Sequence, residues 1–234
     1  MTTNNKALLA AAAIAAAFCA VPAFADDAAV YSNSLRLGSE SVFYHTKADD
    51  ITGPYVPPGV NIKAENLETL YAAYVRRLSS AFDLELAGGY PPQAKVDGKG
   101  PATVGSVPYN RQNVSSARWI SPTLFLEYKF LPESSNLRPY IGVGVNYTTF
   151  YDRDTTALGN AAFGGPTKLS LNASVGPAGT AGLAYHVSGH WNLYASYSIA
   201  RVNTNLVADT AGVIRTTHIQ FGPQVLVIAG GYSF

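Results

Sequence analysis

The sequence predicts an all-β protein, an eight-stranded antiparallel transmembrane β-barrel with short periplasmic turns and longer extracellular loops. Three observations lead to this prediction. Segments that alternate apolar with small or polar residues recur along the chain, as in strands that have one side facing lipid. The connections between these segments alternate in length, and an export segment precedes them. No apolar run after residue 25 approaches the ~20 residues of a spanning helix.

Residues 1–25 have the pattern of a cleaved signal peptide, which leaves 26–234 as the barrel. A basic residue, an Ala-rich apolar run and the small-x-small site Ala23-Phe24-Ala25 follow one another. The single cysteine, Cys19, lies in this segment, so the rest of the chain has no thiol for a disulfide, a nucleophile or a metal site. We therefore expect export to the outer membrane of a Gram-negative cell.

The composition favours a barrel embedded in lipid. Charged residues make up 13% of the chain, against about 25% in typical soluble domains. The chain has 15 Tyr and 21 Gly, and its formal net charge of +1 gives no footprint for nucleic acid. A secreted β-sandwich is the main alternative, because it would bury the same alternating faces against a second sheet.

Strands are expected at eight segments, at about 31–44, 62–78, 81–90, 114–130, 137–152, 169–187, 191–206 and 214–234. In the first four, apolar side chains share one face: Leu35, Leu37 and Phe43; Leu70, Ala72 and Tyr74; Phe82, Leu84 and Leu86; then Leu124, Leu126 and Tyr128. In the last four, the corresponding residues are Ile141, Val143 and Val145; Leu171, Ala173 and Val175; Trp191, Leu193 and Tyr197; then Leu226, Ile228 and Tyr232. A short helical turn is expected at 156–162.

The lengths of the connections distinguish a barrel from a sandwich as the predicted fold. The connections after strands one, three and five are long and the one after strand seven is moderate, whereas those after strands two, four and six span only a few residues. This rhythm is typical of outer-membrane barrels and is not expected of Greek-key crossings. Aromatic residues are expected to form girdles at the two rims, with Tyr128, Tyr140 and Trp191 at the short-turn rim. The terminal Phe234 is expected to be read by the barrel-assembly machinery.

Five stretches carry a resemblance to the OmpW family, which includes the AlkL-type proteins of alkane-using bacteria. They are FDLELAGGYP (82–91), ISPTLFLEYKF (120–130), LRPYIGVGVNYTTFYD (137–152), GTAGLAYHVSGHWNLYASYS (179–198) and GGYSF (230–234). The resemblance implies an eight-stranded barrel with a narrow, largely apolar lumen. It also implies a role in admitting small hydrophobic molecules, by a route that runs from an outer vestibule sideways through the wall into the lipid.

Inward-facing residues are the candidates for the solute path. Those expected to line the lumen are Tyr71, Val75, Phe125, Gly142, Gly144, Asn146 and Phe150, with Tyr55 and Phe163 added from loops. The alternative is that the aromatic residues only fill the small interior of the barrel. Lumen charges are expected at Arg36, Glu40, Glu127 and Lys129, with Arg77, Asp83 and Glu85. They are predicted to pair across strands and close the lumen, unless they are solvated rim charges.

Three prolines, Pro122, Pro177 and Pro223, fall inside predicted strands, where each removes a donor from the ladder. Pro177, beside Gly176 and Gly179, and Pro122 are the candidates for a lateral gate. The alternative is that each marks a bulge or a strand end without a role in transport.

The sequence thus predicts a passive outer-membrane channel whose partners are outer-membrane lipid and small hydrophobic solutes. The alternative function is a structural or surface-interaction barrel whose loops bind partners in a receptor or adhesion role. We expect no enzyme, cofactor or metal site, because no GxSxG motif is present and the four histidines show no metal-ligand spacing.

Overall fold

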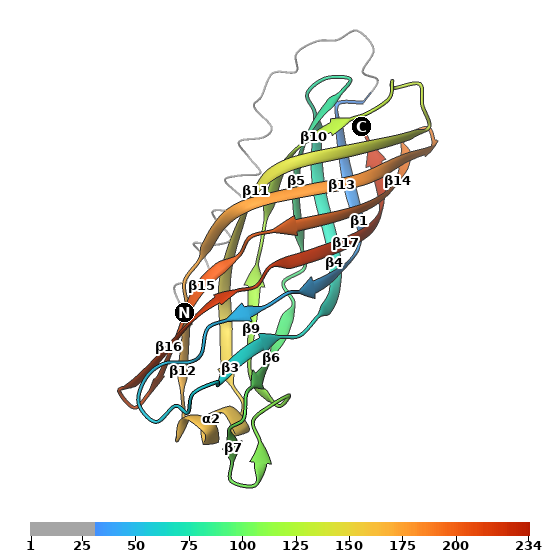
Figure 1. The fold of residues 1–234 in the computed structure, drawn as a ribbon. Helices are drawn as coiled ribbons and strands as arrows, with labels where there is room; N and C mark the ends of the chain where they lie inside the picture. The colour runs from blue at the N-terminus through green and yellow to red at the C-terminus, as the bar shows by residue number, and fades with distance from the viewer. Residues whose placement is uncertain (1–30) are drawn as a thin grey trace.

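The protein, described over residues 31–234 by a computed structural model, is a closed eight-stranded antiparallel β-barrel that continues into a second body at one end (Figure 1). The predicted signal peptide lies outside the described residues. Each barrel strand pairs with the next, and the last pairs with the first. The barrel strands are β1 (Asn33–Tyr44), β4 (Leu67–Arg77), β5 (Phe82–Gly89), β10 (Thr123–Lys129), β11 (Leu137–Thr155), β13 (Ser174–Ser188), β14 (Trp191–Ala200) and β17 (Pro223–Ser233).

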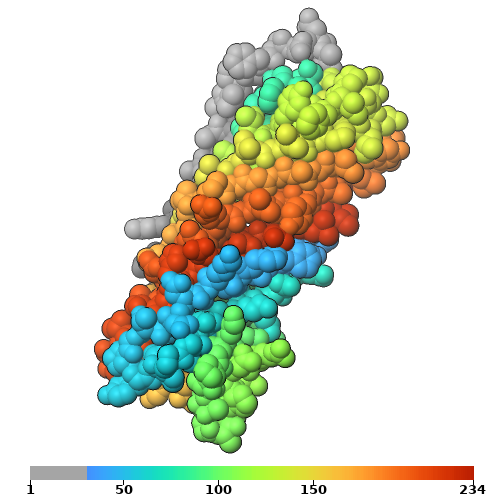
Figure 2. All heavy atoms as spheres, viewed as in Figure 1, coloured from blue at the N-terminus to red at the C-terminus, as the bar shows by residue number. Residues whose placement is uncertain are grey.

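Alternation along each strand separates an apolar outer face from the lumen. On β17, Val227 and Ala229 are buried while Ile228 between them is 65% exposed. The outer face is apolar around the barrel, with Leu37, Leu70, Val143 and Val175 each at least 67% exposed. On the face seen in Figure 2, the strands pack side by side as slanted bands. An apolar belt of this kind is the surface that a barrel presents to hydrocarbon.

Short turns close one end of the barrel. The connections from β4 to β5, from β10 to β11 and from β13 to β14 are all at this end. The first and last strands also meet here, since the Asn33 amide donates to the Phe234 carbonyl at 3.0 Å and the Phe234 amide donates to the Asn33 carbonyl at 2.8 Å. At the predicted periplasmic rim, β1 and β17 are therefore hydrogen-bonded to each other as far as their ends.

At the opposite end of the barrel, two four-stranded sheets form a second body, which we call the extension. We describe the molecule with the extension at the top, so Figure 1 shows it upside down. One contains β2 (Lys47–Ala48), β12 (Lys168–Leu171), β15 (Asn203–Thr210) and β16 (Val213–Gln220). The other contains β3 (Asn61–Ala64), β6 (Gln93–Lys99), β9 (Asn113–Ile120) and the end of β11. A small hairpin, β7 (Thr103–Val104) with β8 (Val107–Pro108), and the helix α2 (Ala157–Phe163) complete it. The helix confirms the helical turn expected at 156–162, and Thr156 caps it by accepting from the Gly159 amide.

The extension has a hydrophobic core of its own. Its buried residues are Ile51, Val60, Ile62, Tyr109, Val114, Leu169, Leu206, Ala208 and Ile219. Burial raises the pKa of Tyr109 to about 12. The long connections are thus a packed body, and Leu158 and Phe163 of α2 pack against it.

The eight-strand prediction is confirmed, with two corrections. Five predicted strands are each divided in two, as β3–β4, β9–β10, β12–β13, β14–β15 and β16–β17. Pro122 and Pro223 lie at two of these divisions because they cannot donate to a ladder, and Gly222 has φ +49. The segment 93–111, expected to be a loop, contains β6, β7 and β8. These strands lack the long apolar outer face of the barrel strands. Within residues 31–234, no helix is long and apolar enough to cross a membrane.

Candidate functional site: the lumen and its wall

A cavity of about 140 Å³ lies inside the barrel where the barrel meets the extension. We call it the upper cavity. Of the residues predicted to line the lumen, Tyr71, Phe125, Asn146 and Phe150 line it. Its walls are mostly apolar, and Val42, Ile62, Leu169, Leu206, Ile219 and Val227 contribute to them. A pocket with these walls suits a small hydrophobic molecule.

One side of the upper cavity is polar, but its polar atoms are already paired. Asn146 Nδ2 donates to Ser121 Oγ at 2.9 Å and to Thr123 Oγ1 at 2.8 Å, while Thr148 Oγ1 donates to Asn146 Oδ1 at 2.8 Å. Because these groups satisfy one another, they add little demand for a polar solute.

The predicted inward glycines Gly142 and Gly144 leave space for atoms of the adjacent strands. A Cβ at Gly144 would collide with the Leu124 carbonyl oxygen and lie 2.7 Å from Phe125 Cδ1. A Cβ at Gly142 would lie 2.8 Å from Thr180 Cγ2. The two glycines thus allow neighbouring strands and side chains to pack closely against β11.

A buried ion-pair cluster, which we call the ionic layer, forms the floor of the upper cavity. Arg36 is 1% exposed and forms salt bridges with both Glu85 and Glu127. Tyr71 Oη donates to Glu85 Oε1 at 3.0 Å, and the guanidinium carbon of Arg36 lies 4.0 Å from the ring centre of Tyr194. These contacts supply the partners that buried charges require.

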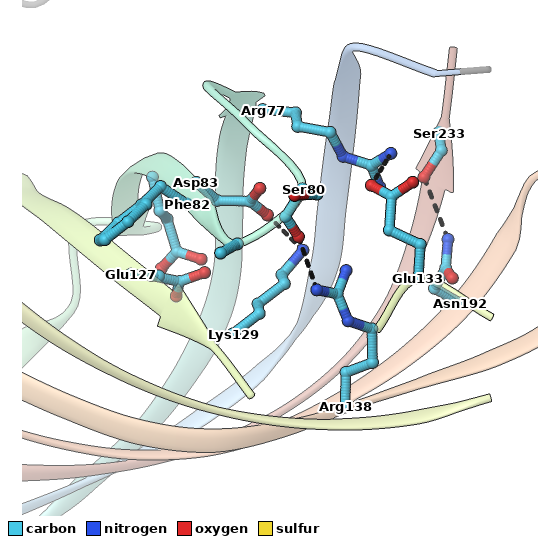
Figure 3. A network of polar contacts seen from close by, with 12 residues as sticks. Arg77, Ser80, Phe82, Asp83, Glu127, Lys129, Glu133, Arg138, Asn192 and Ser233 are labelled. Atoms are coloured by element: carbon cyan, nitrogen blue, oxygen red, sulfur yellow. Dashed lines mark hydrogen bonds and ion pairs between the residues drawn. The ribbon is translucent and has the colours of Figure 1, made fainter. Parts of the chain in front are cut away.

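A second set of charges lies nearer the short turns than the ionic layer does. Figure 3 shows its members Asp83, Lys129 and Arg138. Lys129 pairs with Asp83, and Arg138 Nη2 donates to the Ser80 carbonyl at 2.6 Å. These residues border a lower cavity of about 460 Å³, which Val75 also lines. Val75 was predicted to share one lumen with Phe125, but the ionic layer lies between the two cavities.

The remaining predicted charges and loop residues have different environments. Arg77 pairs with Glu133 at 3.0 Å, with both side chains 27% exposed at the rim (Figure 3). Glu40 lines the upper cavity and, among residues 31–234, has no hydrogen-bond or salt-bridge partner. The prediction for Tyr55 is wrong, because its side chain is 91% exposed. Phe163 packs against the extension core.

The ladder is continuous at Pro177. Pro177 lies opposite Val145 on β11, and its carbonyl accepts from the Arg201 amide at 3.0 Å on the other side. The backbone geometry therefore shows no opening at Pro177, and Gly176 and Gly179 lie in the same paired stretch of β13.

The wall pairing is interrupted instead around residues 88–92. Toward β4, the pairing is nearly continuous: the Tyr90 amide donates to the Leu70 carbonyl at 2.8 Å beyond the Gly89–Tyr71 pair, and the Glu65 amide donates to the Lys95 carbonyl at 3.0 Å before the Val96–Ala64 pair. Toward β10 and β9, it stops at Ala87–Thr123 and resumes at Gln93–Arg118. Two adjacent prolines lie in the interval, and Pro122 lies on the facing chain. We call the segments 88–92 and 119–122 the wall break. Both of its sides line the upper cavity: Gly88, Gly89 and Pro92 on one, and Trp119 and Ser121 on the other.

Four aromatic rings surround the cavity beside this break, and the sequence reasoning named only Phe150. Tyr44 lies 5.7 Å from Trp119 and 6.1 Å from Phe221, and Phe150 lies 5.6 Å from Phe221, measured between ring centres. Trp119 has the same parity as Phe125, so the alternation could have assigned it to the lumen. By the same rule Tyr140 faces inward, near Arg36, and its expected place in the aromatic girdle is wrong.

The described residues contain no group of three or more His, Cys, Asp and Glu side chains that could hold a metal ion. His186 contacts Asn192 and His218 contacts Asn205, all at exposed positions. The chemical features of the lumen are therefore its apolar walls, its ion pairs and Glu40.

Comparison with known proteins gives a consistent result. The OmpW family model matches residues 32–234. Outer membrane protein W of Vibrio cholerae serotype O1 is 28% identical over 222 residues, which cover 95% of this chain and 96% of that protein. Outer membrane protein AlkL of Ectopseudomonas oleovorans is 25% identical over 178 residues, which cover 76% of this chain and 70% of that protein.

Solved structures share the fold. The crystal structure of OprG from Pseudomonas aeruginosa has a TM-score of 0.77 at 23% identity and covers 87% of this chain and 96% of its own. The solid-state NMR structure of AlkL in DMPC bilayers has a TM-score of 0.63 at 21% identity, with coverage of 92% and 96%. Both are outer-membrane barrels.

Proposed function

The chain belongs to the OmpW family of outer-membrane β-barrels, and on that premise we propose that it is a passive channel for small hydrophobic molecules. In this proposal, solutes enter the upper cavity from the extracellular side and leave sideways through the wall break into the lipid. No energy coupling is involved. Selectivity comes from the width and the apolar walls of the cavity.

One observation carries the proposal: the upper cavity ends at the ionic layer but reaches both sides of the wall break. A hydrophobic solute that continued downward would have to cross buried charges, which cannot be separated or desolvated cheaply. Sideways, it would pass between segments 88–92 and 119–122, which have no register pairing with each other and whose prolines cannot donate to a ladder. The apolar belt outside provides the solute with a hydrocarbon phase to enter.

The wall break can be obstructed at one residue. Gly88 borders the cavity but has the outward parity of Leu84 and Leu86, and a Cβ built on it meets no atom within 4 Å. Gly88→Trp should therefore fold and cover the outer mouth of the wall break, and uptake of an alkane such as n-octane by cells that carry it should fall severalfold. Gly230→Trp is the matched control, since Gly230 on β17 is equally open but lies away from the break.

Two results would contradict the proposal at different points. Unchanged octane uptake by Gly88→Trp would remove the sideways exit and leave the channel function intact. A large ohmic conductance in planar bilayers, insensitive to the solute, would contradict a lumen closed by the ionic layer. The expected result is octane uptake with little ion current.

The extension supports a second candidate function, a surface-interaction barrel. It is a packed body that presents Tyr55 at 91% exposure and an exposed hairpin at 103–108. Deletion of this hairpin should abolish binding of a phage or host surface and leave octane uptake unaffected, if this candidate is right. Normal binding by the deletion variant would count against it.

A further inference from the structure

Glu40 is an unpaired carboxylate in an apolar cavity. It shares the inward face of β1 with Arg36, and a Cβ on Gly89 would collide with Glu40 Oε1. The missing side chain at Gly89 therefore lets the carboxylate extend across β4 to the edge of the wall break. Within residues 31–234, Glu40 forms neither a hydrogen bond nor a salt bridge. Glu40 is partly buried, and a carboxylate that loses part of its hydration without gaining a partner would be stabilised by a positive ligand.

No other charge in the cavity compensates Glu40. The only other acidic residue in the lining is Glu85, which Arg36 and Tyr71 already occupy. No lysine or arginine of the described chain lines the cavity. The ionic layer below has one guanidinium facing two carboxylates, so it adds no positive potential. The field inside the upper cavity is therefore negative and is centred on Glu40.

The aromatic rings around the cavity provide the second half of a cation site. Tyr44 lies four residues from Glu40 on the same face of β1, and its ring contacts those of Trp119 and Phe221. Phe150 extends the group through Phe221. Faces of aromatic rings attract an ammonium group, and quaternary ammonium ions are bound in this way by aromatic cages. A neutral hydrocarbon would gain only the apolar contacts.

We propose that the upper cavity selects small organic cations, in which an apolar body carries a quaternary or protonated amine. The amine would lie against Glu40 and the rings of Tyr44, Trp119 and Phe221, and the apolar body would lie along the cavity wall. This inference rests on the proposed function, because the cavity must first admit small molecules. It adds a charge preference that the apolar walls alone would not give.

The chain supplies its own reporter for a binding test. It has two tryptophans, of which Trp191 is 58% exposed at the short-turn rim and Trp119 lines the cavity. Trp191→Phe therefore leaves Trp119 as the single tryptophan, whose emission can be excited selectively over that of the tyrosines. The purified full-length barrel is titrated with benzyltrimethylammonium and with neopentylbenzene, in which carbon replaces the charged nitrogen at nearly the same shape. The cation should bind about tenfold more tightly than the neutral compound.

Two variants assign that preference to Glu40 and to the rings. Glu40→Gln should reduce the preference severalfold, because it removes the negative charge and leaves the aromatic rings and the apolar wall in place. Glu68→Gln is the matched control, because Glu68 is exposed on the outer face of β4 and contacts Ser41. Phe221→Leu keeps the wall apolar, and it should weaken binding of the cation severalfold more than binding of the neutral compound. A difference in SDS-gel mobility between unheated and heated samples verifies that each variant has folded.

Each outcome is decisive. Equal binding of the two compounds by the parent, or a preference that Glu40→Gln leaves undiminished, would overturn the cation site while neopentylbenzene binding upholds the proposed function. If neither compound changed the fluorescence of Trp119, both the cation site and the channel function would be overturned.

Discussion

Arg36 is the central residue of the ionic layer, which separates the upper cavity from the lower cavity. Its guanidinium is buried beneath the upper cavity, and both of its carboxylate partners are on other strands, Glu85 on β5 and Glu127 on β10. The three side chains therefore tie together strands that are not all neighbours in the sheet. A buried charge of this kind contributes little net stability as a pair, but removal of one partner is expensive.

Arg36→Met should destabilise the barrel by about 3–5 kcal/mol, because it leaves two carboxylates buried without a cation. Arg77→Met removes a half-exposed partner of Glu133 and should cost less than about 1 kcal/mol. Urea unfolding in lipid vesicles, followed by tryptophan fluorescence, measures both changes. When Glu85→Gln and Glu127→Gln are added to Arg36→Met, the triple variant should regain most of the lost stability. Equal stability of the two single variants would show that the ionic layer is not a stability determinant.

At the scale of elements, alternation in the sequence was sufficient to predict the barrel strands and their inward faces. It also predicted the alternation of short and long connections. It could not predict the divisions within the strands, since a proline such as Pro177 lies in a continuous ladder while Pro122 lies at a break. Nor could it pair Arg36 with Glu127, because contacts across the lumen depend on the stagger of the strands around the barrel.

The extension should lose stability independently of the barrel. Ile219 is 1% exposed in the extension core, and Ile219→Ala should cost about 2–5 kcal/mol through the cavity it leaves. Ile228→Ala on the outer face of β17 should change stability by no more than about 0.5 kcal/mol. Hydrogen exchange in bilayers would detect faster exchange confined to the extension strands for Ile219→Ala. Faster exchange throughout β1 and β17 would instead mean that the two bodies unfold together.

At the scale of the whole molecule, the apolar belt fixes the position of the barrel in the outer membrane. Val143 is 70% exposed near the middle of the embedded part of β11, and the corresponding face of the neighbouring strands is also apolar. The extension above this belt has buried cores rather than an apolar outer face, so it projects from the membrane.

Val143→Lys should reduce the free energy of folding into vesicles by about 2–4 kcal/mol, the cost of a basic residue at the bilayer midplane. Ile214→Lys is the control, because Ile214 is 45% exposed on β16 in the extension, outside the hydrocarbon. It should fold into vesicles like the parent. A Val143→Lys variant that inserted as well as the parent would place this face of the barrel away from lipid.

The separate core of the extension has a consequence for variation among strains. Residues such as Tyr55 project from a body that is held together by its own buried side chains, while the upper cavity and the ionic layer lie beneath it. Substitutions on that outer surface leave the walls of the upper cavity and the lipid-facing belt unchanged. The surface of the extension that faces the outside of the cell can therefore change in sequence while the interior of the barrel stays the same.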